Sequence, residues 1–170
     1  MAQKGLTQTS SLIQISATVS ETAPNTFTSA QVDLQLNPLD REVFVVQGVD
    51  LDLFPPDLVA NLKTTSSLSL SSTRRTTVAG IDQSNVIASK RIFTQSVTGD
   101  GSVTNEYVAI DTPATALDYI AIIATNDFFL NIEGNANLTI MAANARVYGY
   151  RARADASIYA ALVQSEALSA

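Results

Sequence analysis

The chemistry open to this sequence depends on its carboxylates, because the 170 residues include no histidine and no cysteine. Without histidine, a Ser-His-Asp triad is impossible in its usual form, and general acid–base catalysis would fall to carboxylates or lysine. Asp118, Asp127 and Glu133 are the candidates for an acid–base pair of the glycosidase type. Nothing in their spacing brings two of them to the required separation, and there is no tryptophan to support a sugar ring. We therefore predict that the protein is not an enzyme and uses no cofactor.

A second acidic group, Asp50, Asp52 and Asp57, lies in the segment "DLDLFPPD". Asp50 and Asp52 are two residues apart on a predicted strand, so they share a face and could bind a hard cation such as calcium. A calcium ion takes about six to eight oxygen ligands, and this spacing matches no EF-hand loop. A solvated strand face is the favoured interpretation, and no metal site is predicted.

The segment "VYGYRARAD" places two tyrosines and then two arginines in one short run, each pair spaced two residues apart. On a strand, Tyr148 and Tyr150 share one face, expected to be the core face, while Arg151 and Arg153 share the other. The planar guanidinium group suits paired hydrogen bonds to carboxylates. The pattern predicts salt bridges from Arg151 and Arg153, and two alternatives remain open: partners within the subunit or on a neighbouring subunit.

Charge and composition exclude several classes of protein. The net charge is −6 with a pI near 4.4, which argues against a protein whose main role is to neutralise nucleic acid. No stretch approaches the roughly 20 apolar residues of a membrane span, and the N-terminal "MAQKGLTQTSSLIQ" has no apolar core typical of a secretory signal. The acceptor pattern "NLT" at Asn137 is interpreted as chance.

The surface is expected to be poor in charge. Charged residues make up 15% of the chain, against about 25% in an average soluble domain. A surface rich in serine and threonine costs less to desolvate, as the core of a subunit interface requires. Two interpretations stay equally open: a subunit that covers itself with copies, and an ordinary β-domain with a threonine-rich surface.

Hydrophobic residues recur with the strand period of two along most of the chain. The strongest strand is "EVFVVQGVDLDLF" (42–54), whose first half is apolar on both faces and whose second half alternates, with Gly48 as a predicted bulge. "RRTTVAGI" is expected to continue a strand, residues 82–95 are either a short helix or an irregular strand, and "TGDG" predicts a hairpin. Eight to ten strands without alternating helices predict an all-β antiparallel β-sandwich. We assign residues 1–25 to an extended N-terminal arm, 26–160 to the sandwich and 161–170 to a C-terminal tail, with a short helix at this end as the alternative.

These features resemble single-jelly-roll viral capsid proteins. The resemblance rests on the "EVFVVQGVDLDLF" strand, the "LDYIAIIATNDFFLNIEG" pair and the closing "ARVYGYRARA" strand. It implies a single jelly roll of about eight strands, an arm that reaches adjacent subunits, and self-assembly into an icosahedral shell in the virion. The implied partners are copies of the chain and other capsid proteins. Because Lys4 is the only basic residue of the arm, no direct sequence-specific contact with nucleic acid is expected.

Self-assembly would use interface residues, and the sequence suggests candidates. The candidates are four apolar residues of the arm and the two arginines of the closing strand: Leu12, Ile13, Ile15, Val19, Arg151 and Arg153. The loops "LFPPDL" and "TGDGS" are further candidates. Two rival functions remain: another structural subunit, such as a phage tail, fibre or surface component, and an adhesive or carbohydrate-binding β-sandwich.

Overall fold

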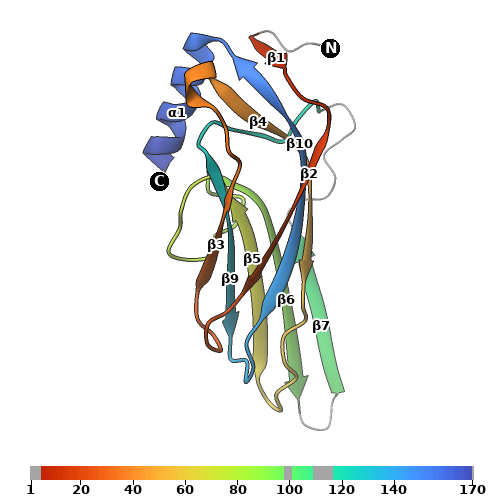
Figure 1. Cartoon of the computed structure of the whole chain (residues 1–170). Helices are drawn as coiled ribbons and strands as arrows, with labels where there is room; N and C mark the ends of the chain where they lie inside the picture. Colours follow the sequence, from red (N-terminus) through yellow and green to blue (C-terminus); the bar gives the residue numbers. More distant parts are fainter. Residues whose placement is uncertain (1–4, 98–100, 109–116, 170) are drawn as a thin grey trace.

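The computed structural model describes residues 5–97, 101–108 and 117–169. In this part of the chain ten strands are followed by one helix (Figure 1). The elements are β1 (Leu6–Gln8), β2 (Ile13–Ser20), β3 (Thr28–Asp33), a 3-10 turn η1 (Pro38–Asp40), β4 (Glu42–Leu53), β5 (Lys63–Ser71), β6 (Val86–Val97), β7 (Gly101–Val108), β8 (Ala121–Ile123), β9 (Asp127–Asn135), β10 (Ala142–Ala154) and α1 (Ala156–Ser169).

The strands form two antiparallel sheets whose pairs are nested along the chain. β2 pairs with β10, β3 with β9, β4 with β8 and β5 with β6. One sheet has the order β2-β10-β4-β8, with β1 on the same edge as β2, and the other has the order β3-β9-β5-β6-β7. Nested pairs split between two facing sheets are the arrangement of a jelly roll. The sequence prediction of an all-β sandwich with jelly-roll topology is confirmed.

The core lies between the two sheets and follows the alternation of the strands. Phe44, Val46 and Val49 of β4 face Leu68 and Leu130 of the opposite sheet, and all five side chains are buried. The predicted bulge of β4 is confirmed, because Tyr148 pairs with Gly48 while Gly149 pairs with Val46. Gln47 therefore has no pairing partner on β10. Before the bulge the even-numbered residues of β4 face the main core, and after it the odd-numbered residues do.

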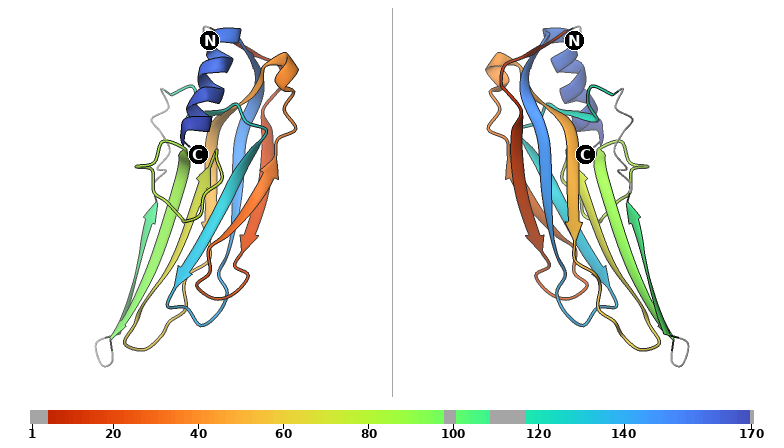
Figure 2. Two further views of the ribbon diagram at one scale, coloured as in Figure 1. Left: turned by 90° about the vertical axis from the view of Figure 1, so that its left-hand side faces the viewer. Right: turned by 90° about the vertical axis from the view of Figure 1, so that its right-hand side faces the viewer.

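A second, smaller core explains why the first half of β4 is apolar on both sides. Helix α1 packs Ile158 and Leu162 over Val43 and Val45, on the face of the sheet that points away from the main core. Tyr150 joins this cluster beneath the helix, whereas Tyr148 lies on the same outer face beyond it and donates to Asp50. The tyrosine face of β10, predicted to be the core face, therefore points away from the opposite sheet. The helix lies at the end of the sandwich opposite the β2–β3, β4–β5 and β9–β10 connections (Figures 1 and 2).

The helix is also anchored by a buried carboxylate. Glu166 accepts hydrogen bonds from the backbone N–H groups of Ala124 and Thr125, at 3.1 and 2.8 Å. Burial raises the pKa of Glu166, and the hydrogen bonds only partly offset this effect. Among the residues that the structure describes, no helix is long and apolar enough to cross a membrane.

Several local predictions can be compared with the structure. The predicted strand in "RRTTVAGI" is wrong: residues 74–80 form a loop, in which Arg75 Nη1 donates to Asn85 Oδ1 at 2.7 Å. Residues 86–97 are the strand β6, and β6 and β7 pair as the hairpin prediction requires, although residues 98–100 of the turn lie outside the described residues. The segment assigned to an arm contains β1 and β2, edge strands of the chain's own sheet, and most of the segment assigned to a tail belongs to α1.

Candidate subunit interface at the loop end

Three connections, β2–β3, β4–β5 and β9–β10, meet at one end of the sandwich, at the bottom of Figure 1. We call this the loop end. The side chain of Glu21, only 3% exposed, ties two of these connections together. Its Oε1 accepts hydrogen bonds from the N–H groups of Gly134 and Thr26, at 2.6 and 3.1 Å. Its Oε2 accepts from the N–H of Met141 at 2.7 Å. Because three backbone donors converge on one buried carboxylate, the connections cannot move independently without breaking charge-assisted bonds.

Two asparagines extend this network. Asn25 and Asn137 are joined twice: Asn25 Nδ2 donates to Asn137 O, and Asn137 N donates to Asn25 Oδ1, both at 2.8 Å. Asn137 Nδ2 also donates to Thr65 O at 2.9 Å, and Asn137 is 4% exposed. The "NLT" motif therefore has its acceptor nitrogen buried and bonded, so a glycan cannot be attached to the folded chain at this position.

Asp57 joins the β4–β5 connection to the same unit. Its Oδ2 accepts hydrogen bonds from the N–H groups of Thr139 and Leu138, at 2.8 and 2.9 Å, and Oδ1 accepts from the Thr139 hydroxyl at 2.9 Å. The backbone hydrogen bond from Thr139, with smaller help from its hydroxyl and from the Leu138 N–H, holds the pKa of Asp57 below its ordinary value against a small desolvation effect.

The structure separates the three aspartates that the sequence grouped. Asp50 and Asp52 point from β4 to the outer face, where Tyr148 Oη donates to Asp50 at 2.9 Å and Asn144 Nδ2 donates to Asp52 at 3.3 Å. Asp57 instead serves the loop end. Within residues 5–97, 101–108 and 117–169, no group of three or more histidine, cysteine or acidic side chains could hold a metal ion.

The loop end displays large apolar side chains to solvent. Five of them lie on the β4–β5 and β9–β10 connections, and they are 47–74% exposed: Phe54, Leu58, Leu62, Leu138 and Ile140. We call this set the apolar end. Asp57 is the only charged residue in segments 54–62 and 136–141, and its carboxylate is already hydrogen-bonded. A rigid, apolar surface without an unpaired charge is suited to contact with another protein.

The other predicted interface residues lie elsewhere. Val19 is 4% exposed in the main core, and Ile13 and Ile15 are half-buried against it, so these side chains pack within their own chain. Leu12, between β1 and β2, is 61% exposed. The interface role of these residues stays a prediction.

Arg151 and Arg153, the two arginines predicted to form salt bridges, have partners within the chain. Arg151 Nη1 lies 3.6 Å from Glu42 Oε2, and Arg151 Nη2 donates to Leu34 O at 2.9 Å. Arg153 lies 3.7 Å from Asp40, and both of these side chains are more than half exposed. The structure thus supplies the intrasubunit partners that the sequence left as one alternative, and contacts to a neighbouring subunit stay a prediction.

Two of the acid–base candidates lie far apart on β9 of the second sheet, and the third precedes β8 of the first sheet. Asp127 and Glu133 lie at positions on β9 that are six residues apart, which corresponds to about 20 Å along a strand. This exceeds the roughly 5–10 Å that glycosidases require between their carboxyl groups. Asp118 lies before β8, where its backbone carbonyl accepts a 3.5 Å hydrogen bond from Gln47.

Sequence reasoning identified part of the loop end. It named the loop "LFPPDL", which carries Phe54 and Leu58, but it missed Glu21, Asn137 and the exposed Leu138 and Ile140. The turn compositions of "ETAPN" and "GNANLTI" are the only local signals, and they do not reveal that these segments meet.

Comparisons with known proteins identify no family for this chain. No family model matches the chain, and no curated protein matches it. A chain in a solved structure of Desmodium yellow mottle tymovirus is similar over 86% of this chain and 91% of that chain, with 10% sequence identity and a TM-score of 0.34.

Proposed function

We propose that the protein is a structural subunit of a viral shell, a single-jelly-roll coat protein that assembles with copies of itself. The topology supports this proposal in general terms, because jelly rolls occur in viral capsid proteins as well as in lectins and cupins. The specific support comes from the apolar end. In this proposal the loop end faces neighbouring subunits around a symmetry axis, and the working location of the protein is the virion.

The size of the apolar end indicates what kind of contact it can make. The exposed fractions of its five residues correspond to about three whole apolar side chains. Burying these side chains would contribute roughly 4–8 kcal/mol. Association alone costs an estimated 4–15 kcal/mol, so one such pairwise contact would be weak. A closed ring or shell, in which each copy has two or more neighbours, repeats the contact and is the arrangement we favour.

The charge pattern supports a structural role over catalysis or genome binding. We propose that the protein acts without cofactor or metal and has no enzymatic activity. With a net charge of −6, the chain would leave neutralisation of the genome to another component of the particle.

Particle mass tests the proposal. The purified 18.0 kDa chain is examined over a range of concentrations by analytical ultracentrifugation and by negative-stain microscopy. We expect closed shells or rings that form cooperatively above a threshold concentration. Leu58→Lys combined with Ile140→Lys should abolish them, because like charges would meet around the axis. Leu39→Lys is the matched control, since Leu39 is 92% exposed in η1, the turn between β3 and β4 that lies at the opposite end of the sandwich (Figure 1).

The same measurement separates the rival functions. A wild-type chain that stays monomeric at high concentration contradicts the proposal, as does a Leu58/Ile140 double variant that assembles like the wild type. Open tubes or fibres instead of closed shells would support a tail or fibre subunit.

A further inference from the structure

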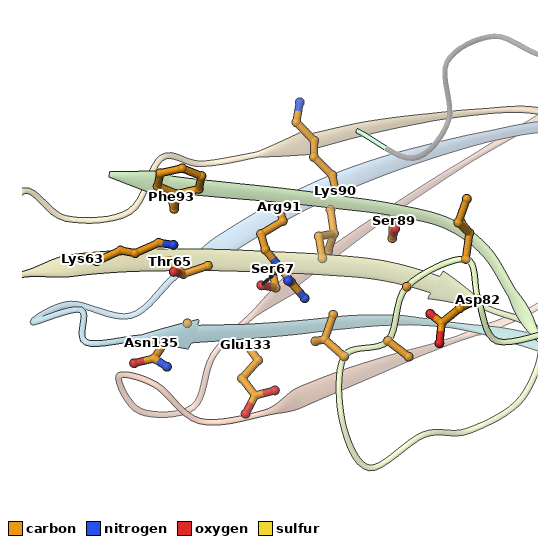
Figure 3. Close-up of a pocket in the computed structure, with 16 residues that line it drawn as sticks. Lys63, Thr65, Ser67, Asp82, Ser89, Lys90, Arg91, Phe93, Glu133 and Asn135 are labelled. Atoms are coloured by element: carbon orange, nitrogen blue, oxygen red, sulfur yellow. Dashed lines mark hydrogen bonds between the residues drawn. The ribbon is translucent and has the colours of Figure 1, made fainter. Parts of the chain in front are cut away.

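A groove of about 890 Å³ runs across the outer face of the β3-β9-β5-β6-β7 sheet (Figure 3). Its floor is formed by outward-facing residues of β5, β6 and β9, and its wall by residues 78–82 of the loop between β5 and β6. The side chains of this face point away from the main core. The groove borders the loop end, because two of its lining residues make loop-end contacts: the N–H of Gly134 donates to Glu21 and the carbonyl of Thr65 accepts from Asn137.

The strand register arranges the floor as two parallel rows. In the first row Thr65 stands between Phe93 and Asn135, its partners on β6 and β9. In the second row Ser67 stands between Arg91 and Glu133. The rows are about 7 Å apart and each spans about 10 Å. An aromatic ring, an amide, two hydroxyls, a guanidinium and a carboxylate therefore face one shared space.

The positive charge of this groove is only partly used. Arg91 is exposed and donates from Nε to Ser67 Oγ at 3.2 Å, and among the described residues no ion pair is formed with its Nη groups. Lys63 Nζ lies 4.2 Å from the centre of the Phe93 ring, a cation–π contact that is readily exchanged for another partner at an exposed site. Lys90 points to the other face of the sheet, where Nζ donates to Leu51 O at 3.2 Å.

We propose that this groove binds an acidic saccharide. The two Nη groups of Arg91 would hold the sugar carboxylate by parallel hydrogen bonds, with Lys63 adding a second positive charge. Sugar hydroxyl groups would bond to Thr65 and Asn135, and would donate to Glu133. The C–H face of the sugar ring would pack on the Phe93 ring.

The mixture of groups favours a saccharide over other anions. Glu133 and Asp82, both on the groove, accept hydrogen bonds from hydroxyl donors but would repel a chain of phosphates. A nucleic-acid surface requires several unopposed cations. In this groove the positive charges of Lys63 and Arg91 are matched by the negative charges of Asp82 and Glu133. A neutral sugar would leave the Arg91 guanidinium unused.

Ligand binding tests this proposal on the unassembled chain, so its outcome does not depend on shell formation. Saturation-transfer NMR and titration calorimetry are performed with a sialylated lactose, with lactose and with inorganic phosphate. We expect saturation transfer to the sialylated sugar, weaker transfer to lactose and no competition by phosphate at equal concentration. Arg91→Gln should weaken binding about tenfold or more, the expected effect of losing charge-assisted hydrogen bonds. Phe93→Leu should also weaken it, by removing the ring surface.

Arg74→Gln is the matched control. Arg74 is an exposed arginine in the connection between β5 and β6 whose residues 78–82 form the groove wall, but Arg74 itself does not line the groove. Unchanged melting temperatures would show that Arg91→Gln and Phe93→Leu are folded. The proposal is overturned if no sugar shows transfer, if lactose binds as tightly as its sialylated form, if phosphate competes equally, or if Arg91→Gln binds like the wild type.

Discussion

Replacing Glu21 with alanine should destabilise the whole domain. The substitution leaves three backbone N–H groups, those of Thr26, Gly134 and Met141, without their acceptor at a site that is 3% exposed. Each buried donor left unpaired costs about 1–3 kcal/mol. Allowing for water that enters the vacated space, we expect a loss of about 3–5 kcal/mol in the free energy of unfolding. This is a large part of the roughly 5–15 kcal/mol by which a domain of this size is stable. At about 2–4 °C per kcal/mol, the loss would lower the melting temperature by roughly 6–20 °C.

Urea denaturation measures this loss, and hydrogen exchange locates it. Exchange at the Gly134 and Met141 amides should accelerate most. Glu21→Gln should cost about half as much, because glutamine fills the same volume and keeps one acceptor oxygen but turns an NH₂ group toward a donor. Asp52→Ala is the matched control: it removes an exposed carboxylate with one 3.3 Å hydrogen bond and should cost less than about 0.5 kcal/mol. A loss below about 1 kcal/mol for Glu21→Ala would refute the view that this carboxylate holds the loop end together.

Three further changes test other parts of the structure. Gly149→Ala would place a Cβ atom 2.3 Å from Val45 O, forcing β4 and β10 apart at the bulge; we expect a loss of about 1–3 kcal/mol in urea denaturation. Glu166 has a raised pKa in the folded state, so its contribution to stability is largest at acid pH and falls as the pH rises from the unfolded value through the raised folded value; in Glu166→Gln this part of the pH dependence should vanish. Asp57 has a lowered pKa, so its contribution is present above the unfolded value and is lost as the pH falls through the folded value; Asp57→Asn should remove it, as unfolding measured between about pH 2 and 7 would show.

The strands were predictable from the sequence because their signal is local. In β4, the apolar residues on both faces of the first half anticipated two covering layers, and Gly48 anticipated the bulge. The identity of the second layer was not predictable, since α1 meets β4 more than a hundred residues away in the sequence. For the same reason the tyrosine face of β10 was expected in the main core, although Tyr150 packs in the cluster under the helix and Tyr148 lies on the outer face.

The loop end could not be predicted, because its contacts join residues far apart in the chain. Glu21 and Gly134 are separated by 113 positions, and Asp57 and Thr139 by 82. Each connection taken alone has the composition of an ordinary turn. The loop 74–80 failed as a strand prediction for a related reason: Thr73 and Arg75 bond to the side chain of Asn85, which holds this segment away from the sheet ladder.

Both ends of the sandwich bury a hydrogen-bonded carboxylate, Glu166 at the helix end and Glu21 at the loop end, and the case for assembly rests on how the exposed apolar side chains are grouped. At the helix end, charges such as Arg153 and Asp40 lie outside, while Ile158 and Leu162 of α1 pack on the second core. Exposed leucines occur there too, Leu39 in η1 and Leu168 in α1, and such scattered apolar side chains are ordinary for a soluble surface. At the loop end, Glu21 and Asn137 are buried, and the large apolar side chains of the apolar end face solvent. The buried polar groups are hydrogen-bonded and therefore stabilise the subunit by itself. The exposed apolar side chains, by contrast, contribute to stability only where another surface covers this end.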